Sequence, residues 1–330
     1  MTTRRSAFLG AVAAATLIAL PAAAQELNFG IISTESQATS KPNWTPFLAD
    51  MEKAIGAKIN AFFAPDYAGI IEAMRFNKVQ IAWYGNASAI QAVDRSSAEV
   101  FVQTGYKTGG HGYYSVLLAH KDSPLTSLQD VVGAPGKLTF GNGDPNSTSG
   151  FLIPSYYAWA QNNVDVRKHF TRVVSGNHEA NMLAISAKQV DVATGNTEDL
   201  ERFKMNQPDR FAQFKVIWQS PLIASDPITW RTDLPAPMKE KVKSFFINYG
   251  KPVDGKSAEE AARQTQVLQN LQWGHFRDSS NKQLIPIREV ALFRDRLKIE
   301  QDDKMPADEK AAKIKEIDQK LADLKKQAGV

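Results

Sequence analysis

The feature that most constrains the fold is a repeated alternation of short apolar segments with segments of helical periodicity. The first run lies between residues 27 and 85. The expected strands are "LNFGIIS" (27–33), "AKINAFFA" (57–64) and "VQIAWYG" (79–85), and the expected helices are "WTPFLADMEKAIG" (44–56) and "DYAGIIEAMRFNK" (66–78). Because a helix between two strands lets them lie parallel in one sheet, this pattern predicts a parallel α/β architecture.

The same alternation returns in the second part of the chain. The further expected strands are 137–142, 170–176, 190–195 and 214–220. There is also a weak internal echo, since "VQIAWYGN" ends at Asn86 and "VDVATGN" ends at Asn196, each after a helix that begins near Tyr67 or His178. Two similar units separated by 110 residues, from Asn86 to Asn196, indicate two lobes of one design and not a short solenoid repeat.

Two extended segments are predicted to cross between the lobes, "YYSVLLAH" (113–120) and "PLIASDPITWR" (221–231). The predicted division is 26–115 and 230–300 for lobe 1, 116–229 for lobe 2, and 301–330 for a C-terminal helical tail. Ligands of open α/β sheets bind beyond the carboxyl ends of the strands. In a two-lobed protein those ends face each other, so the sequence predicts a ligand cleft between the lobes.

The first 24 residues have the pattern of a secretory signal peptide. Arg4 and Arg5 precede an uncharged apolar core at 7–20, Pro21 ends that core, and small residues at 22–24 predict cleavage near Ala24. The paired arginines leave twin-arginine export open beside the general route. No cysteine follows that could carry a lipid anchor. The expected location is therefore the periplasm.

Composition excludes several classes of function. The formal net charge of +4 falls to +2 when Arg4 and Arg5 are removed, which is too balanced to indicate nucleic-acid binding. The absence of cysteine excludes thiol chemistry, and the five histidines form no metal-ligand motif. Neither a Walker P-loop nor a G-x-S-x-G motif occurs. The chain is therefore expected to be no enzyme, with no cofactor and no metal.

The stretch "GDPNSTSGF" (143–151) places Ser147, Thr148 and Ser149 between a turn and an expected helix. A helix N-terminus offers unpaired N–H groups and the positive end of the helix dipole, so it favours anions. Three hydroxyls with these amides match the oxygens of a tetrahedral oxyanion without a neighbouring Lys or Arg. The alternative is a well-capped helix with spare serines, and spacing alone does not decide between them.

Five other side chains are candidates for the same cleft. His178, Tyr67 and Tyr113 could donate to an anion, although each could equally be an ordinary core or loop residue. Glu198 and Asp226 are negatively charged. Each could also have an ordinary structural role, Glu198 in the first turn of a helix and Asp226 in a turn. If both carboxylates face the cleft, the expected ligand is a small zwitterion with an anionic and a cationic end.

The final segment, 307–327, is a Lys/Glu-rich helix. Ile314, Ile317, Leu321 and Leu324 recur at heptad spacing. This pattern fits a terminal helix packed on its own lobe, and it equally allows a dimer contact.

The chain resembles a known family, the phosphonate-binding periplasmic proteins of ABC importers. The resemblance covers about residues 27–300 and weakens beyond them. Its motifs are "LNFGIISTESQ", "AFFAPDYAGII", "MRFNKVQIAWYGN", "TFGNGDPNSTSGF", "NTEDL", "SPLIASDPITWR" and "QLIPIREVALF".

The resemblance implies a type II two-lobed fold that closes on its ligand and delivers it to an inner-membrane permease. It implies that Ser147, Thr148 and Ser149 hold the phosphonate oxygens. Tyr67, Tyr113 and His178 match the positions that complete the phosphonate pocket, and Glu198 and Asp226 match those that bind the amino group of 2-aminoethylphosphonate. The resemblance thus implies eight ligand residues. In relatives the terminal helix can serve in a homodimer. The rival readings are a phosphate or phosphite receptor and a hydrolase that uses His178 with a neighbouring serine.

Overall fold

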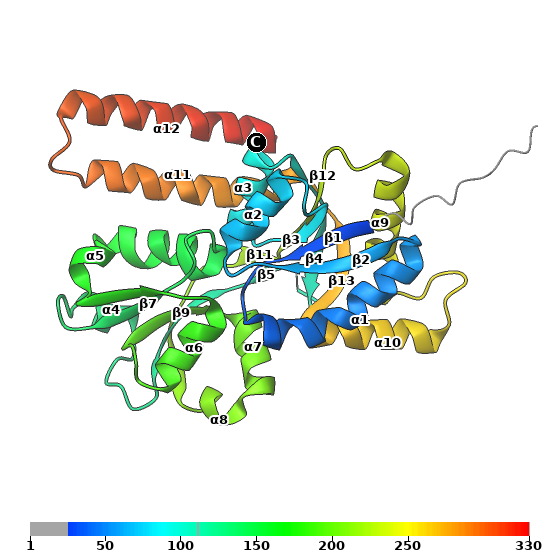
Figure 1. Cartoon of the computed structure of the whole chain (residues 1–330). Coiled ribbons are helices and arrows are strands. Elements are labelled where there is room, and N and C mark those ends of the chain that lie inside the picture. Colours follow the sequence, from blue (N-terminus) through cyan, green and yellow to red (C-terminus); the bar gives the residue numbers. More distant parts are fainter. Residues whose placement is uncertain (1–25, 111, 330) are drawn as a thin grey trace, which may run out of the picture.

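The computed structural model describes residues 26–110 and 112–329. The predicted signal peptide and its cleavage site lie outside the described residues. Two mixed sheets, each covered by helices, form two lobes that face each other (Figure 1). Within the described part of the chain, no helix has the length and apolar character needed to cross a membrane.

The first lobe contains a six-stranded sheet with the strand order β13-β4-β12-β3-β1-β2. Its strands are β1 (Glu26–Ile31), β2 (Lys58–Phe63), β3 (Ile81–Trp83), β4 (Ala98–Tyr106), β12 (Pro227–Arg231) and β13 (Trp273–Asp278). Its helices are α1 (Gln37–Ile55), α2 (Tyr67–Arg75), α3 (Asn86–Arg95), α9 (Ala236–Asn248), α10 (Ala258–Asn270) and the short η4 (Asn281–Leu284). Aromatic rings dominate this core, with Phe29 packed against Trp44, Phe47 and Phe246.

The second lobe contains a five-stranded sheet with the order β10-β6-β9-β7-β8. Its strands are β6 (Ser115–His120), β7 (Thr139–Asn142), β8 (Arg172–Ser175), β9 (Val192–Asn196) and β10 (Phe214–Gln219). Its helices and helical turns are α4 (Leu128–Val132), η1 (Thr148–Leu152), η2 (Ser155–Trp159), η3 (Ala160–Asn162), α5 (Val166–His169), α6 (His178–Ser186), α7 (Thr197–Asn206) and α8 (Pro208–Phe211). Two apolar clusters form its core, around Phe140 and around Met182.

All seven strands expected from the sequence are present and the α/β class is confirmed, but the sheets are mixed and not parallel throughout. β1 runs parallel to β2 and β3, and β7 runs parallel to β8 and β9, whereas β12, β13, β6 and β10 are antiparallel to their neighbours. The reason is the passage between lobes, because β6 and β12 are reached from the other lobe and not through a helix of their own sheet. α1 also starts at Gln37, seven residues before the expected helix, because Ser36 caps it and Pro42 and Pro46 are tolerated inside it.

The two connections between the lobes are hydrogen-bonded to each other. β5 (Gly112–Tyr113) and β11 (Ile223–Ala224) pair antiparallel, with Tyr113 opposite Ile223. This short ribbon is where the chain leaves the first lobe and returns to it, as the two extended segments suggested. The exact lobe boundaries at 115/116 and 229/230 stay a prediction.

The chain ends in a helical hairpin made of α11 (Ile285–Glu300) and α12 (Ala307–Ala328), which lies along one edge of the molecule (Figure 1). Ile317, Leu321 and Leu324 of α12 are buried. An Arg296–Asp318 ion pair at 3.0 Å joins the two helices. α12 therefore uses its apolar face within its own chain.

Candidate functional site

The candidate site is a closed pocket between the lobes. Its empty interior is small, with about 10 Å³ open to the centre of a water-sized molecule. The residues that line it are Ile32, Thr34, Tyr67, Trp83, Gly85, Tyr113, Ser147, Thr148, Ser149, His178, Asn196, Glu198, Asp199, Arg202 and Asp226. The structure thus brings all eight residues expected from the sequence into one pocket.

Helix starts surround this pocket, because it lies beyond the carboxyl ends of the parallel strands. Tyr67 is the first residue of α2, Gly85 caps α3, and Ser147 caps η1. His178 is the first residue of α6, and Glu198 lies in the first turn of α7. Each of these helices directs the positive end of its dipole toward the same region, which favours an anion there.

The hydroxyl cluster is held by an unusual backbone. Leu152 N donates to Ser147 O at 3.1 Å, so the chain enters wide π-helical turns and not the regular helix expected from the sequence. Ser147 Oγ accepts from Gly150 N at 3.0 Å, which makes it the N-cap. The preceding loop closes tightly at Gly143, where any side chain would meet the Gly150 carbonyl at 2.4 Å. The three hydroxyls are consequently buried side by side.

His178 lies against the serines of this cluster. Its Nε2 is 3.4 Å from Ser149 Oγ and 3.1 Å from Asn196 Nδ2. Asn196 Oδ1 accepts from Asp199 N, and its Nδ2 donates to Asp199 Oδ2, which fixes the amide beside Nε2. Nδ1 has no partner among the described residues. Burial lowers the pKa of His178, so this ring is a neutral donor and not a cation.

Tyr67 and Tyr113 are both buried in the pocket wall, and burial raises the pKa of each phenol well above its usual value. Both hydroxyls therefore remain protonated donors. The hydroxyl of Tyr113 donates to Asp226 Oδ1 at 3.0 Å, so in this structure it orients a carboxylate at the acidic end of the pocket. This orientation differs from the expectation that Tyr113 completes the anion end.

The acidic end of the pocket is made by Glu198 and Asp226. Asp226 Oδ2 accepts from the indole N–H of Trp83 at 3.1 Å, so both of its oxygens are occupied by neutral donors. Glu198 is buried, and its Oε1 has no hydrogen-bond partner among the described residues. Burial raises the pKa of Glu198 well above its usual range and that of Asp226 to about 7. Both carboxyls therefore resist ionisation in the absence of a nearby cation.

Seven pocket residues are not among the eight expected ones: Ile32, Thr34, Trp83, Gly85, Asn196, Asp199 and Arg202. The hydroxyls have no Lys or Arg as sequence neighbours, but α7 brings Arg202 into the pocket wall. Its guanidinium is already bonded to Asp199 and is 3.3 Å from Glu35 Oε1. One signal was available: Glu198 and Arg202 are four residues apart, so both lie on one face of a helix.

The lobes touch directly around the pocket. Thr148 Oγ1 of the second lobe accepts from Ala87 N of the first at 2.8 Å, an approach that Gly85 permits, since a side chain there would lie 2.9 Å from the same oxygen. Glu179, next to His178, accepts from Ser36 N at 2.7 Å at the start of α1. The structure is therefore the closed form of a two-lobed protein.

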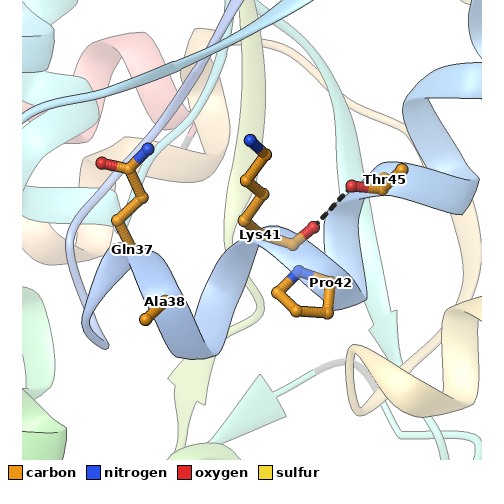
Figure 2. Close-up of a pocket in the computed structure, with 5 residues that line it drawn as sticks. All are labelled: Gln37, Ala38, Lys41, Pro42 and Thr45. Carbon is orange, nitrogen blue, oxygen red and sulfur yellow. Dashed lines mark hydrogen bonds between the residues drawn. The ribbon is translucent and has the colours of Figure 1, made fainter.

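A larger, open depression on α1 is a weaker candidate. Gln37, Ala38, Lys41, Pro42 and Thr45, all from α1, line it (Figure 2). Thr45 Oγ1 donates to the Lys41 carbonyl at 2.8 Å, so its hydroxyl is satisfied within the helix. A shallow surface with one charged side chain offers no convergent polar groups for a small ligand.

No group of three or more His, Cys, Asp or Glu side chains that could hold a metal ion occurs within residues 26–110 and 112–329. The pocket offers hydroxyls, helix amides, one neutral imidazole and two protonatable carboxyls. Such groups can bind a small polar molecule reversibly between two hinged lobes. The fold and the site together define a two-lobed solute-binding protein.

The comparisons identify the family. The family model of the phosphonate periplasmic substrate-binding proteins of ABC transporters matches residues 29–284, and the chain belongs to this family. It is 52% identical over 322 residues to the phosphonates-binding periplasmic protein of Escherichia coli K12, covering 96% of this chain and 92% of that protein. A crystal structure of the binding component of a Pseudomonas aeruginosa phosphonate transporter matches with a TM-score of 0.88 at 50% identity, covering 92% of this chain and 98% of that one.

A more distant relative is the phosphate-import protein PhnD of Mycolicibacterium smegmatis, at 26% identity over 67% of this chain and 71% of that protein. The protein is thus a periplasmic solute-binding receptor of a phosphonate ABC transporter, and members of its family are substrate-binding proteins and not enzymes.

Proposed function

We propose that this receptor captures 2-aminoethylphosphonate in the interlobe pocket. The observation that carries the proposal is the pairing of two buried carboxyls, Glu198 and Asp226, with a hydroxyl-lined anion end in one closed pocket. A phosphonate without an amine has no use for these carboxyls. An ammonium would supply the charge that lets them ionise.

In this proposal Ser147, Thr148 and Ser149, with the amides of η1, bind the phosphonate oxygens. Tyr67 and His178 add donors at the same end. Charge-assisted hydrogen bonds of this kind are each worth about 1.5–3 kcal/mol. Tyr113 would hold Asp226 in position for the ammonium.

Delivery to the permease follows from closure. Since residues of both lobes line the pocket, a ligand that touches both stabilises the closed state and shifts the population toward it. The closed form would then present one continuous surface to the inner-membrane permease.

The proposal also includes export by the predicted signal peptide, cleaved near Ala24, and the predicted lobe boundaries. A homodimer through the C-terminal helix stays part of it as a prediction. Because Ile317, Leu321 and Leu324 are buried within the chain, such a dimer would use the remaining surface of the hairpin.

The alternative ligand is phosphate or phosphite. The similarity to a phosphate-import protein supports this alternative. Calorimetric titration with 2-aminoethylphosphonate, methylphosphonate and inorganic phosphate separates the two. We expect the aminophosphonate to bind most tightly. Tighter binding of phosphate than of 2-aminoethylphosphonate would reject the proposed ligand.

A further inference from the structure

A second enclosed space, which we call the rear chamber, adjoins the pocket. It is small, with about 10 Å³ open to the centre of a water-sized molecule. Thr34, Trp83 and Arg202 line both the pocket and the rear chamber, so these three side chains form the wall between them. The other lining residues of the rear chamber are Glu35, Ser40, Asn43, Trp44, Leu271 and Trp273.

The shared wall lies at the acidic end of the pocket. Trp83 donates its indole N–H to Asp226 Oδ2 at 3.1 Å. Arg202 follows Glu198 by four residues on α7, which places both side chains on one face of that helix. A ligand chain that extends beyond the two carboxyls therefore reaches this wall.

The rear chamber has the chemistry of a cation site. The rings of Trp44, Trp83 and Trp273 surround it, with ring centroids 5.2–5.5 Å apart. Buried Glu35 supplies a carboxyl, and Trp273 Nε1 has no hydrogen-bond partner among the described residues. Indole faces and carboxylates both attract ammonium and guanidinium groups.

Arg202 already provides a cation at this place. Its guanidinium bonds to Asp199, and its Nε lies 3.3 Å from Glu35 Oε1 and its Nη1 3.2 Å from the Leu271 carbonyl. The start of α1 and α7 come together here, so the bond to Glu35 also joins the two lobes (Figure 1). A second cation arriving from the pocket would meet a charge of its own sign in an occupied space.

We propose that Arg202 is the residue that limits the length of the ligand's amino chain. The inference rests on the proposed function, because it requires an amine held by Glu198 and Asp226. A two-carbon chain ends at these carboxyls. The ammonium of a three- or four-carbon chain has to enter the space that the guanidinium fills. Without the guanidinium, the pocket and the rear chamber become continuous, and Asp199 and Glu35 are free to bind the longer amine.

The test compares 2-aminoethyl-, 3-aminopropyl- and 4-aminobutylphosphonate by calorimetry. In the wild type we expect affinity to fall by about ten-fold or more from the two-carbon to the four-carbon amine, since a misfit of one methylene alone can cost about ten-fold. Arg202→Ala should raise the ratio of aminobutyl to aminoethyl affinity by about ten-fold or more. Arg202→Lys retains the cation and should keep the wild-type ranking. The ratio is the readout because Arg202 also links the lobes, so every affinity falls when it is removed.

Arg288→Ala is the matched control. It removes an arginine that pairs with Asp94 at 2.6 Å and does not line the pocket, and it should leave the ranking unchanged. If thermal melting shows that Arg202→Ala is unfolded, Arg202→Gln removes the charge, shortens the side chain and carries the same expectation.

The possible failures are distinguishable. Wild type that binds 4-aminobutylphosphonate as tightly as 2-aminoethylphosphonate overturns the length limit without any variant. An unchanged ratio in a folded Arg202→Ala protein, or in folded Arg202→Gln, overturns it as well. Wild type that binds methylphosphonate as tightly as 2-aminoethylphosphonate overturns the proposed function itself.

Discussion

Replacement of Glu198 by glutamine tests the amine site most selectively. Glu198 is buried, its Oε1 is unpartnered among the described residues, and burial raises its pKa well above the usual range. With methylphosphonate bound, the side chain is therefore a neutral acid, and glutamine of nearly the same shape should change affinity by less than about three-fold. With 2-aminoethylphosphonate bound, a charge-assisted bond worth about 1.5–3 kcal/mol is lost, which corresponds to a weakening of about ten- to hundred-fold.

Isothermal titration calorimetry with both ligands measures this difference. Glu72→Gln is the matched control, since it removes a carboxylate from the exposed face of α2, the helix that begins with pocket residue Tyr67. It should leave both affinities unchanged. Equal losses for the two ligands in Glu198→Gln would refute an ammonium role for this residue.

Three further predictions follow from the same site and from the tail. The affinity for 2-aminoethylphosphonate should fall as pH falls through about 7, because Asp226 with a pKa of about 7 then protonates and no longer pairs with the amine; methylphosphonate, titrated beside it, shares the phosphonate ionisation but should lack this extra loss. The melting temperature of ligand-free Asp226→Asn should rise relative to that of wild type between pH 5 and pH 8. The reason is that the folded pKa of Asp226, about 7, lies above its unfolded value of about 3.9, so ionisation of this carboxyl destabilises the wild type increasingly as pH rises between the two values. A difference in melting temperature that does not change with pH in scanning calorimetry would contradict this. Deletion of 307–330 should lower the melting temperature by exposing the partners of Ile317, Leu321 and Leu324 and leave 2-aminoethylphosphonate affinity unchanged, and light scattering of both proteins reports whether a dimer is lost; reduced affinity would show that the tail supports the pocket.

The strands were predictable because each is a short apolar run bounded by helical periodicity. Their directions were not, since an apolar run such as 214–219 reads the same whether its neighbour runs parallel or antiparallel. Only the passage between lobes decides that β10 pairs antiparallel with β6. The expected helix followed the amphipathic stretch 44–56, whereas α1 begins at Gln37 after a good cap, Ser36.

The site residues were predictable where a polar or titratable side chain lies at the start of a helix. Ser147 to Ser149, His178 and Glu198 all follow a strand by a few residues, and that position alone indicates the cleft. Arg202 lies in the middle of α7, where an arginine on a helix is ordinarily solvated. Its burial depends on Glu35, 167 residues away, and no local pattern reveals such a pair.

The most direct test of the account is a crystal structure of the mature protein with 2-aminoethylphosphonate. The account predicts the phosphonate oxygens within hydrogen-bond distance of the hydroxyls of Ser147 to Ser149 and the amine between Glu198 and Asp226. Phosphorus bound away from Thr148, or an amine directed away from both carboxyls, would contradict it.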